Sequence, residues 1–304
     1  MDDNQTSKEK LIENINIKNK VRNNIKSNEQ ILEPSIEERI LCCCLDYDLT
    51  ISEFKSYIEL KKRVISEYDE KNDEHELNLQ ALFDKSKQIL SKNKKKDSIE
   101  IENNETLATI NSSNKSQISN EDSEIWRKIG FQTTNPRTDF RAGGIFSLRF
   151  MNYFANNHEK EYKKIINEEY FTFALVCIRL TYLIRVYLFL LSSEEIKISL
   201  KYQKNILANR KELKNFCYFL YDNNNLLLEI SSLGLNFIYQ KFVEQKKTGY
   251  KEINYFIIDP IIRSCIECIK KCLNNLNVDD DIISQMKNCF REKYLKDLDI
   301  INII

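Results

Sequence analysis

The residues best suited to chemistry lie in one short window, between Trp126 and Gly144. Three of the five glycines, one of the three prolines and the only tryptophan of the chain fall there. The window contains the tripeptide Asp139-Phe140-Arg141. An arginine is permanently charged, and its planar fork of donors fits carboxylates and phosphates. Because local rules of helix formation tend to break at functional or strained sites, we take this window as the candidate site.

The first half of the window predicts a turn that is anchored in the core. Trp126, Phe131 and Phe140 are large apolar side chains, and we expect them to be buried, although Phe140 could also face a partner. Gly130 lets the chain leave the preceding helix, and we expect a positive φ there. Gln132 could orient the loop or contact a partner, and the first role is the better supported.

The second half of the window predicts how the turn becomes rigid. Pro136 fixes its own φ and so stiffens the loop. Thr138 and Asp139 are candidates to cap the next helix by accepting its free amides. The pair Gly143-Gly144 allows a close backbone approach or an unusual turn. The pattern therefore predicts a stiff loop between two buried helices, with Arg141 at its tip.

The rest of the chain predicts an all-α fold. Apolar residues recur at helical spacing, no alternating run indicates a strand, and so few glycines and prolines argue against a many-stranded sandwich or barrel. Helices are expected at 74–90, 121–129, 144–156, 159–168, 171–192, 209–222, 225–246, 255–276 and about 280–297, with Pro260 at or just inside the start of one of them.

The domain organisation follows from shifts in composition. Residues 1–33 are polar and are expected to be disordered. A single multi-helix domain is expected over 34–300, starting with the capping-box pattern at Ser35 and a helical segment that breaks near 46–50. The Lys-, Asn- and Ser-rich stretch 91–120 is expected to be a flexible insert, and 121–156 contains the motif.

The bulk composition argues against several classes of protein. Lys+Arg and Asp+Glu are both 46, so neither nucleic acid nor an anionic membrane is favoured as a partner. The N-terminus has no signal-peptide pattern and no Gly at position 2, so we expect a cytoplasmic protein with reduced thiols. The apolar run 173–191 contains Arg179 and Arg185, which favours a buried helix over a transmembrane segment.

Other candidate sites are weaker. Cys265, Cys268 and Cys272 share one helical face, but the chain has only two histidines, so core thiols are a better interpretation than a metal site. The run Cys42-Cys43-Cys44 could be acylated, although three consecutive side chains point in different directions on a helix. No Ser-His-Asp, Cys-His, Walker or Rossmann arrangement is present.

The window resembles the ELMO domain, and within it the ELMOD type, whose pattern is W-x3-GFQ-x3-P-x-TDFRG-x-G. Ten identities fall within nineteen residues, and weaker likeness extends over about 35–275. The matching residues are Trp126, Gly130, Phe131, Gln132, Pro136, Thr138, Asp139, Phe140, Arg141 and Gly144.

Two positions depart from the family pattern. Ala142 stands where the family has a glycine, and Phe146 stands where it has a leucine. If that glycine needs a positive φ, Ala142 would be strained by about 1 kcal/mol or more. We expect Gly143 to take over that conformation.

The resemblance implies a function. ELMOD-type proteins activate Arf and Arf-like small GTPases, and the family's arginine, which acts on the bound nucleotide, corresponds to Arg141. A guanidinium supplied in this way stabilises the charge that develops during GTP hydrolysis. The resemblance implies no cofactor in this chain, because GTP and Mg²⁺ would belong to the partner, and any membrane association would also come through the partner. The protein would be a regulator of an enzyme.

Alternatives remain at this point. Arg141 could be a structural residue that pairs with Asp139 or Asp122. The chain could also be a non-catalytic ELMO-type scaffold, or an effector that binds a GTPase without accelerating hydrolysis.

Overall fold

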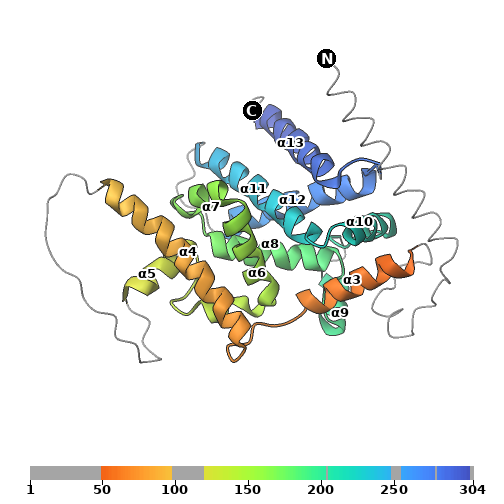
Figure 1. Cartoon of the computed structure of the whole chain (residues 1–304). Helices are drawn as coiled ribbons and strands as arrows, with labels where there is room; N and C mark the ends of the chain where they lie inside the picture. Colours follow the sequence, from red (N-terminus) through yellow and green to blue (C-terminus); the bar gives the residue numbers. More distant parts are fainter. Residues whose placement is uncertain (1–48, 98–119, 203–204, 248–254, 278, 302–304) are drawn as a thin grey trace, which may run out of the picture.

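The computed structural model describes residues 49–97, 120–202, 205–247, 255–277 and 279–301 (Figure 1). These residues form helices and no strand, which confirms the predicted all-α class. In chain order the elements are α3 (Ile51–Val64), α4 (Asp73–Asp97), α5 (Asn120–Ile129), the 3₁₀ helix η1 (Pro136–Arg141), α6 (Gly144–Asn157), α7 (Glu159–Ile166), α8 (Phe173–Tyr187), α9 (Ser193–Tyr202), α10 (Arg210–Asp222), α11 (Leu226–Lys247), α12 (Tyr255–Asn275) and α13 (Ile282–Ile301).

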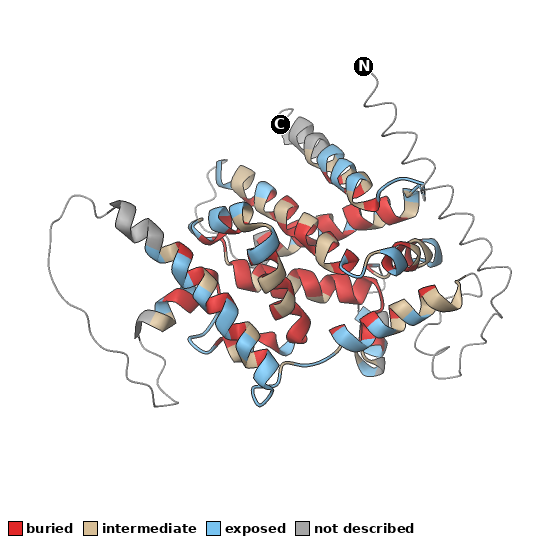
Figure 2. Ribbon diagram, viewed as in Figure 1, coloured by how far each residue is buried: buried red, intermediate tan, exposed pale blue. Residues whose placement is uncertain are grey.

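Helix α8 lies at the centre of the core. It packs against α6, α11 and α12, and Figure 2 shows buried residues along most of its length. The prediction of a buried helix in this apolar run is therefore confirmed. Within the described residues, we find no helix with the length and apolar character needed to cross a membrane.

The other helices surround α8 in three groups. Helix α4 packs against α5 and α6 at one end of the molecule, and α3 packs against α10 at the other end (Figure 1). Helix α13 covers α11 and α12. Of the elements that carry the sequence window, α6 packs against both α4 and the central helix, α5 packs against α4, and η1 packs against α6 and α8.

Local capping signals explain where two helices begin. Before α3, the Thr50 hydroxyl accepts a hydrogen bond from the Glu53 amide (3.2 Å), and the Glu53 carboxylate accepts one from the Thr50 amide (2.9 Å). Asn209 and Glu212 form the same reciprocal pair at the start of α10. Each pair satisfies amides that the first turn leaves free. The start of α3 agrees with the predicted break near 46–50.

The end of α8 differs from the prediction, which extended the helix to 192. The helix ends at Tyr187, and Phe189 has a φ of 56°. The buried Tyr57 hydroxyl donates to the Leu188 carbonyl at 2.9 Å and stabilises this turn. Helix α9 was not predicted. Its signal was Ser192 followed three residues later by Glu195, which exchange hydrogen bonds in the manner of a capping box.

Four further predictions need correction or lie outside the described residues. Pro260 lies inside α12 and not at its start, so the carbonyl four residues earlier loses its helical donor. Residues 91–97 and Asn120, predicted to belong to a flexible insert, are helical, and the rest of that predicted insert lies outside the described residues. The predictions for residues 1–33 and for the helix starting at Ser35 lie outside the described residues.

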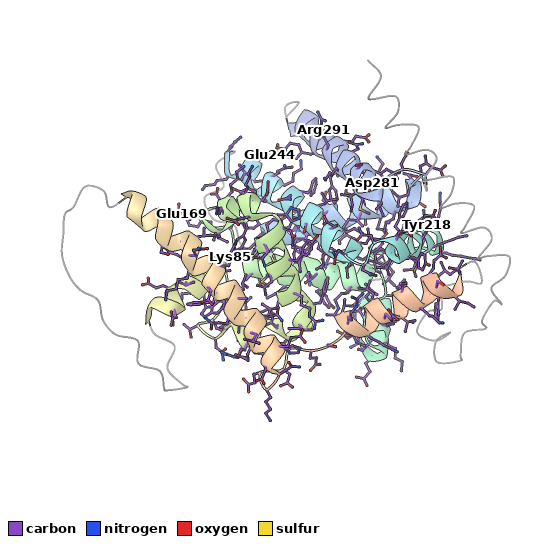
Figure 3. All side chains as sticks on the ribbon, in the orientation of Figure 1. Lys85, Glu169, Tyr218, Glu244, Asp281 and Arg291 are labelled. Atoms are coloured by element: carbon purple, nitrogen blue, oxygen red, sulfur yellow. The ribbon has the colours of Figure 1, made fainter. Side chains whose placement is uncertain are left out.

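An ion pair joins α4 to α7 on the surface. Lys85 on α4, labelled in Figure 3, donates to the Glu159 carboxylate at 2.8 Å. Lys163, one turn further along α7, pairs with the same carboxylate at 2.5 Å. Hydrogen bonds from Lys163 and then Lys85 lower the pKa of Glu159 from 4.5 to about 2.

A pH-dependent contribution to stability follows. A carboxyl group whose pKa is lowered in the folded state stabilises the fold above its ordinary pKa, and this contribution is lost as the pH falls towards the lowered value. We expect Glu159→Gln to be slightly less stable than the wild type at pH 7, and the difference to disappear between pH 4.5 and about 2. Urea unfolding at a series of pH values measures this. Glu161→Gln on the same helix is the control, and a difference that stays constant with pH would contradict the assignment.

Candidate functional site

Gly130 begins the turn between α5 and η1. Its φ is 96°, as predicted, and its amide and that of Phe131 donate to carbonyls in the last turn of α5. A Cβ atom at Gly130 would lie 2.6 Å from the backbone of Thr172, at the start of α8. Both the conformation and the close approach therefore require glycine here.

Pro136 to Arg141 form the short helix η1, where the sequence predicted a stiff loop. Pro136 is in the first turn, and the side chain of Asn135 accepts a hydrogen bond from the amide of Arg137. The missed signal was Asn135-Pro136, since asparagine is a preferred N-cap and proline is favoured in the first helical turn.

The prediction that Thr138 and Asp139 cap the following helix is wrong. Helix α6 begins after Gly143 without a side-chain cap. Instead, the Asp139 carboxylate accepts a hydrogen bond from the Gln132 amide at 2.8 Å, and the Thr138 hydroxyl donates to the Asn135 carbonyl at 3.0 Å. Both side chains therefore close the turn on itself. The side chain of Gln132 is exposed.

A row of aromatic rings holds the turn against α4. Trp126 contacts Phe83 of α4 and Phe131, with ring centroids 5.0 and 5.3 Å apart. Phe131 meets Phe140 edge-on at 5.7 Å, and Phe140 stacks on Tyr68 at 5.0 Å. Phe140 is only 1% exposed, so the alternative that it faces a partner is wrong. Such pairs add stability beyond their buried area.

A charged pair reinforces this row of rings. Arg137 binds Glu76 of α4 through two hydrogen bonds, of 2.8 and 2.5 Å. The Tyr68 hydroxyl donates to the same carboxylate at 2.6 Å. Burial, followed by the neighbouring Glu76, raises the pKa of Tyr68, so its hydroxyl stays protonated and remains a donor. The planar bidentate contact fixes the orientation of η1 relative to α4.

Gly143 and Gly144, at the end of the turn, differ in backbone conformation. Gly144 has a φ of 60°, and a Cβ atom there would lie 2.6 Å from the Ser66 carbonyl, which accepts a hydrogen bond from the Ile145 amide. Gly143 has a φ of −98° and Ala142 a φ of −86°, both in the ordinary region. The expected strain at Ala142 is therefore absent, and the expectation that Gly143 adopts a positive φ is wrong.

A buried arginine of α8 lies beneath Ala142. Arg185 is 2% exposed, and its guanidinium donates to the Leu190 carbonyl at 3.2 Å and to the Ala142 carbonyl at 3.5 Å. The Glu195 carboxylate is 3.8 Å away. Burial lowers the pKa of Arg185, and Glu195 partly offsets this effect. The sequence signal for this residue is a charge within an apolar run, which argues against a membrane span and also indicates a buried polar contact.

Arg141 itself is exposed. Its Nε atom donates to the Thr138 carbonyl at 3.0 Å, and its two terminal nitrogens have no hydrogen-bond partner among the described residues. The alternative of a structural ion pair is not supported, because Asp139 binds the Gln132 amide and Asp122 pairs with Lys87. The guanidinium is therefore oriented by its own helical turn, and both terminal groups remain available.

Arg141 lines a groove of about 840 Å³ between the turn and α8. The side chains of α8 that its packing leaves partly open, Leu175, Arg179 and Tyr182, all line this groove. They recur at helical spacing and so form one face. The remaining lining residues are Gln132, Thr133, Thr138, Asp139, Ala142, Thr172, Ile178 and Ile258.

The charge inside the groove is positive. Arg179 contacts Asp259 at 2.7 Å, and Arg263 contacts the other oxygen of the same carboxylate at 2.7 Å. Burial acts to raise the pKa of Asp259, but the hydrogen bonds from Arg263 and Arg179 outweigh it, and the pKa is lowered. One carboxylate thus faces two guanidinium groups, and one of these, Arg179, lines the same groove as Arg141.

The structure also places the cysteines that were candidates for a metal site. Cys265, Cys268 and Cys272 are buried along α12, as core thiols are expected to be. Among the residues that the structure describes, no group of His, Cys, Asp or Glu is arranged to hold a metal ion.

The comparisons with known proteins agree with this motif. The sequence profile of the ELMO/CED-12 family matches residues 58–256. The chain is similar to ELMO domain-containing protein 2 of Mus musculus, with 31% identity over 137 residues, which cover 41% of this chain and 45% of the relative. The Homo sapiens protein of the same name matches with the same values.

A shorter match reaches higher identity. ELMO domain-containing protein A of Dictyostelium discoideum is 49% identical over 47 residues, which cover 16% of this chain and 5% of that protein. The matches thus cover less than half the length of these relatives, and no solved structure matches the chain. The chain belongs to the ELMO/CED-12 family, and its similarity to ELMO domain-containing protein 2 places it with the ELMOD type.

The glycine geometry yields a prediction about stability. We expect Gly130→Ala to lower the free energy of unfolding by roughly 2 kcal/mol or more, because the new methyl group meets the Thr172 backbone at an unfavourable φ. Ala142→Gly, which restores the family's residue, should change it by less than about 1 kcal/mol, because Ala142 is unstrained. Chemical unfolding of both variants measures this, and a large stabilisation by Ala142→Gly would contradict the geometry.

The buried arginine yields a second prediction. Arg185→Lys keeps the charge but cannot reach the Leu190 and Ala142 carbonyls together. We expect faster amide hydrogen exchange in residues 142–145 and in the turn at 188–190, with unchanged exchange in α11. Lys241→Met, which removes another buried cation, is the control and should leave exchange at 142–145 unchanged. Unaltered protection of 142–145 in Arg185→Lys would show that Arg185 does not support this turn.

Proposed function

We propose that this protein is a GTPase-activating protein for Arf or Arf-like small GTPases, and that Arg141 stabilises the transition state of GTP hydrolysis. The observation that supports the proposal most strongly is the state of Arg141. Its backbone belongs to a turn fixed by packed rings and glycines, while both terminal nitrogens of its guanidinium lack a partner among the described residues. Because the side chain is exposed, these nitrogens are hydrated in the free protein and can bind phosphate oxygens without breaking a contact within the fold.

The chemistry suits this arrangement. During GTP hydrolysis, negative charge spreads over the phosphoryl oxygens, and an arginine from a partner can accelerate the reaction on the order of a thousandfold or more. The hydrogen bond from Nε to the Thr138 carbonyl limits the rotamers of Arg141 and leaves the fork of terminal donors for phosphate oxygens. A fixed turn also reduces the entropy lost when the side chain inserts.

The lining of the groove suits a protein segment, which supports a partner protein as the molecule that carries the phosphates. Its floor is apolar at Leu175, Ile178 and Ile258, and its polar residues lie both on the turn that carries Arg141 and on α8, at Arg179 and Tyr182. A segment of the GTPase beside the nucleotide would occupy the groove while Arg141 reaches the phosphates. The GTPase would supply GTP and Mg²⁺, this chain would bring no cofactor, and both proteins would meet in the cytoplasm.

Ala142 no longer favours the effector alternative. That alternative rested on a distorted turn, and the φ of −86° at Ala142 shows an ordinary backbone next to Arg141.

Single-turnover hydrolysis tests the proposal. The wild-type chain is mixed with each member of a panel of GTP-loaded Arf and Arf-like GTPases, and the rate of phosphate release is measured. We expect at least one GTPase to be accelerated on the order of a thousandfold. Arg141→Ala should lose nearly all of this, and Arg141→Lys most of it, because an ammonium group lacks the planar fork.

Measurements of binding affinity distinguish a loss of catalysis from a loss of binding to the GTPase. Arg141→Ala should bind the GTP-analogue form of the same GTPase nearly as well as the wild type does. Arg127→Ala, which removes an exposed arginine of α5 outside the groove, should keep full activity. Binding by the wild type without acceleration of any GTPase would identify an effector and overturn the proposal, as would full activity of Arg141→Ala.

A further inference from the structure

Two cysteines face each other between α12 and α13. The Sγ atoms of Cys268 and Cys289 are 3.8 Å apart, and these two helices pack against each other. Of the six cysteines in the described part of the chain, Cys289 is partly exposed and the other five are buried. A reagent from solvent can therefore reach Cys289 first, and the thiol of Cys268 on the other helix is in contact with it.

The surroundings favour the thiolate form of Cys289. Hydrogen bonds donated by the thiols of Cys268 and then Cys272 lower the pKa of Cys289; burial opposes this effect and the charge of Lys271 assists it. The pKa of Cys268 is raised, chiefly because its thiol donates to Cys289 and also because it is buried. A nucleophilic sulfur and a protonated second thiol are thus in contact, an arrangement typical of reactive cysteines that have a resolving partner.

We propose that Cys289 is a peroxide-reactive site that forms a reversible disulfide with Cys268. This inference is independent of the proposed action on GTPases. It concerns the contact between α12 and α13, and neither cysteine lines the groove that contains Arg141.

The reaction balances with hydrogen peroxide as the oxidant. The Cys289 thiolate attacks one peroxide oxygen, the O–O bond breaks, and hydroxide leaves to give a sulfenic acid. The Cys268 sulfur then attacks the Cys289 sulfur, so the S–O bond breaks, the S–S bond forms and water leaves. Overall, two thiols and one peroxide give one disulfide and two waters, and the two sulfurs supply the two electrons.

Forming the bond requires only a local movement. A disulfide has an S–S distance of about 2.05 Å, so the sulfurs must approach by roughly 1.7 Å, which side-chain rotation with a small helix shift can provide. The bond would join residues 21 apart in sequence and tie α13 covalently to α12. Cellular thiols would reverse it by exchange.

Peptide mapping of the oxidised chain tests the proposal. The reduced, folded full-length protein is treated with a stoichiometric amount of hydrogen peroxide, alkylated under denaturing conditions and digested. We expect the loss of two alkylatable thiols and one cross-linked peptide pair joining Cys268 to Cys289, both reversed by dithiothreitol. Cys289→Ser should lose no thiol, while Cys217→Ser, which removes a buried cysteine outside this pair, should form the same link.

The intermediate provides a second measurement. In Cys268→Ser the sulfenic acid on Cys289 should accumulate and be trapped by dimedone. In the wild type, alkylation of native Cys289 should be at least tenfold faster at pH 7 than that of the buried thiols, and its rate should stay high well below the ordinary cysteine pKa of about 8.5. This measurement needs no variant, so it holds even if a substitution prevents folding.

Two results would overturn the proposal. The first is alkylation of Cys289 with the pH profile of an ordinary thiol, together with no loss of thiols under peroxide. The second is a cross-link from Cys289 to Cys272 or to any of Cys42, Cys43 and Cys44 in place of Cys268.

Discussion

The packing of aromatic rings from Phe83 to Tyr68 is the contact on which the candidate site depends. Through Trp126, Phe131 and Phe140 it joins α4 to both ends of the turn that carries Arg141. An exposed guanidinium gains a defined position only if its backbone is fixed, because the side chain alone has many rotamers. The buried rings fix the backbone of the turn. Gly130 and Gly144 let the turn lie directly against the backbones of Thr172 and Ser66, where a Cβ atom would not fit.

Three arginines around the turn differ in the partners that their guanidinium groups bind. Arg137 is neutralised by Glu76 and serves the fold. Arg185 is buried beneath the turn, where backbone carbonyls satisfy it more closely than the carboxylate at 3.8 Å does. Arg141 donates one hydrogen bond, to a backbone carbonyl, and forms no ion pair among the described residues. The three guanidinium groups therefore differ in role: Arg137 binds α4, Arg185 stabilises the turn from within the core, and Arg141 has terminal nitrogens that are available. Only Arg141 can bind another molecule without breaking an ion pair or a buried contact.

Much of this arrangement could be predicted from the sequence. Helical periodicity predicted most of the helices, and the spacing of Trp126, Gly130 and Pro136 predicted a stiff turn with a positive φ at its start. Local signals were less reliable where tertiary contacts decide the outcome. Asp139 reads as a helix cap but binds the Gln132 amide, because the 3₁₀ helix turns its side chain back. The apolar run after Tyr187 reads as more helix, but the Tyr57 hydroxyl stabilises a turn there.

The groove could not be predicted, because it depends on which face of α8 remains open. Leu175, Arg179 and Tyr182 lie in a run that is apolar on nearly every side, and sequence periodicity does not show which of them its neighbours cover. The same holds for Cys289. Its sequence neighbours give no sign that it faces two thiols of another helix, and only the packing of α13 on α12 brings them together.

The most direct test of the central claim is binding to a transition-state analogue. A GTPase that this chain accelerates is loaded with GDP, and the affinity of the chain for it is measured with and without fluoroaluminate, which mimics the transferring phosphoryl group. The account predicts much tighter binding with fluoroaluminate and loss of that preference in Arg141→Ala, while binding to the GDP form stays unchanged. An equal fluoroaluminate preference in the wild type and in Arg141→Ala would show that this guanidinium does not contact the transition state.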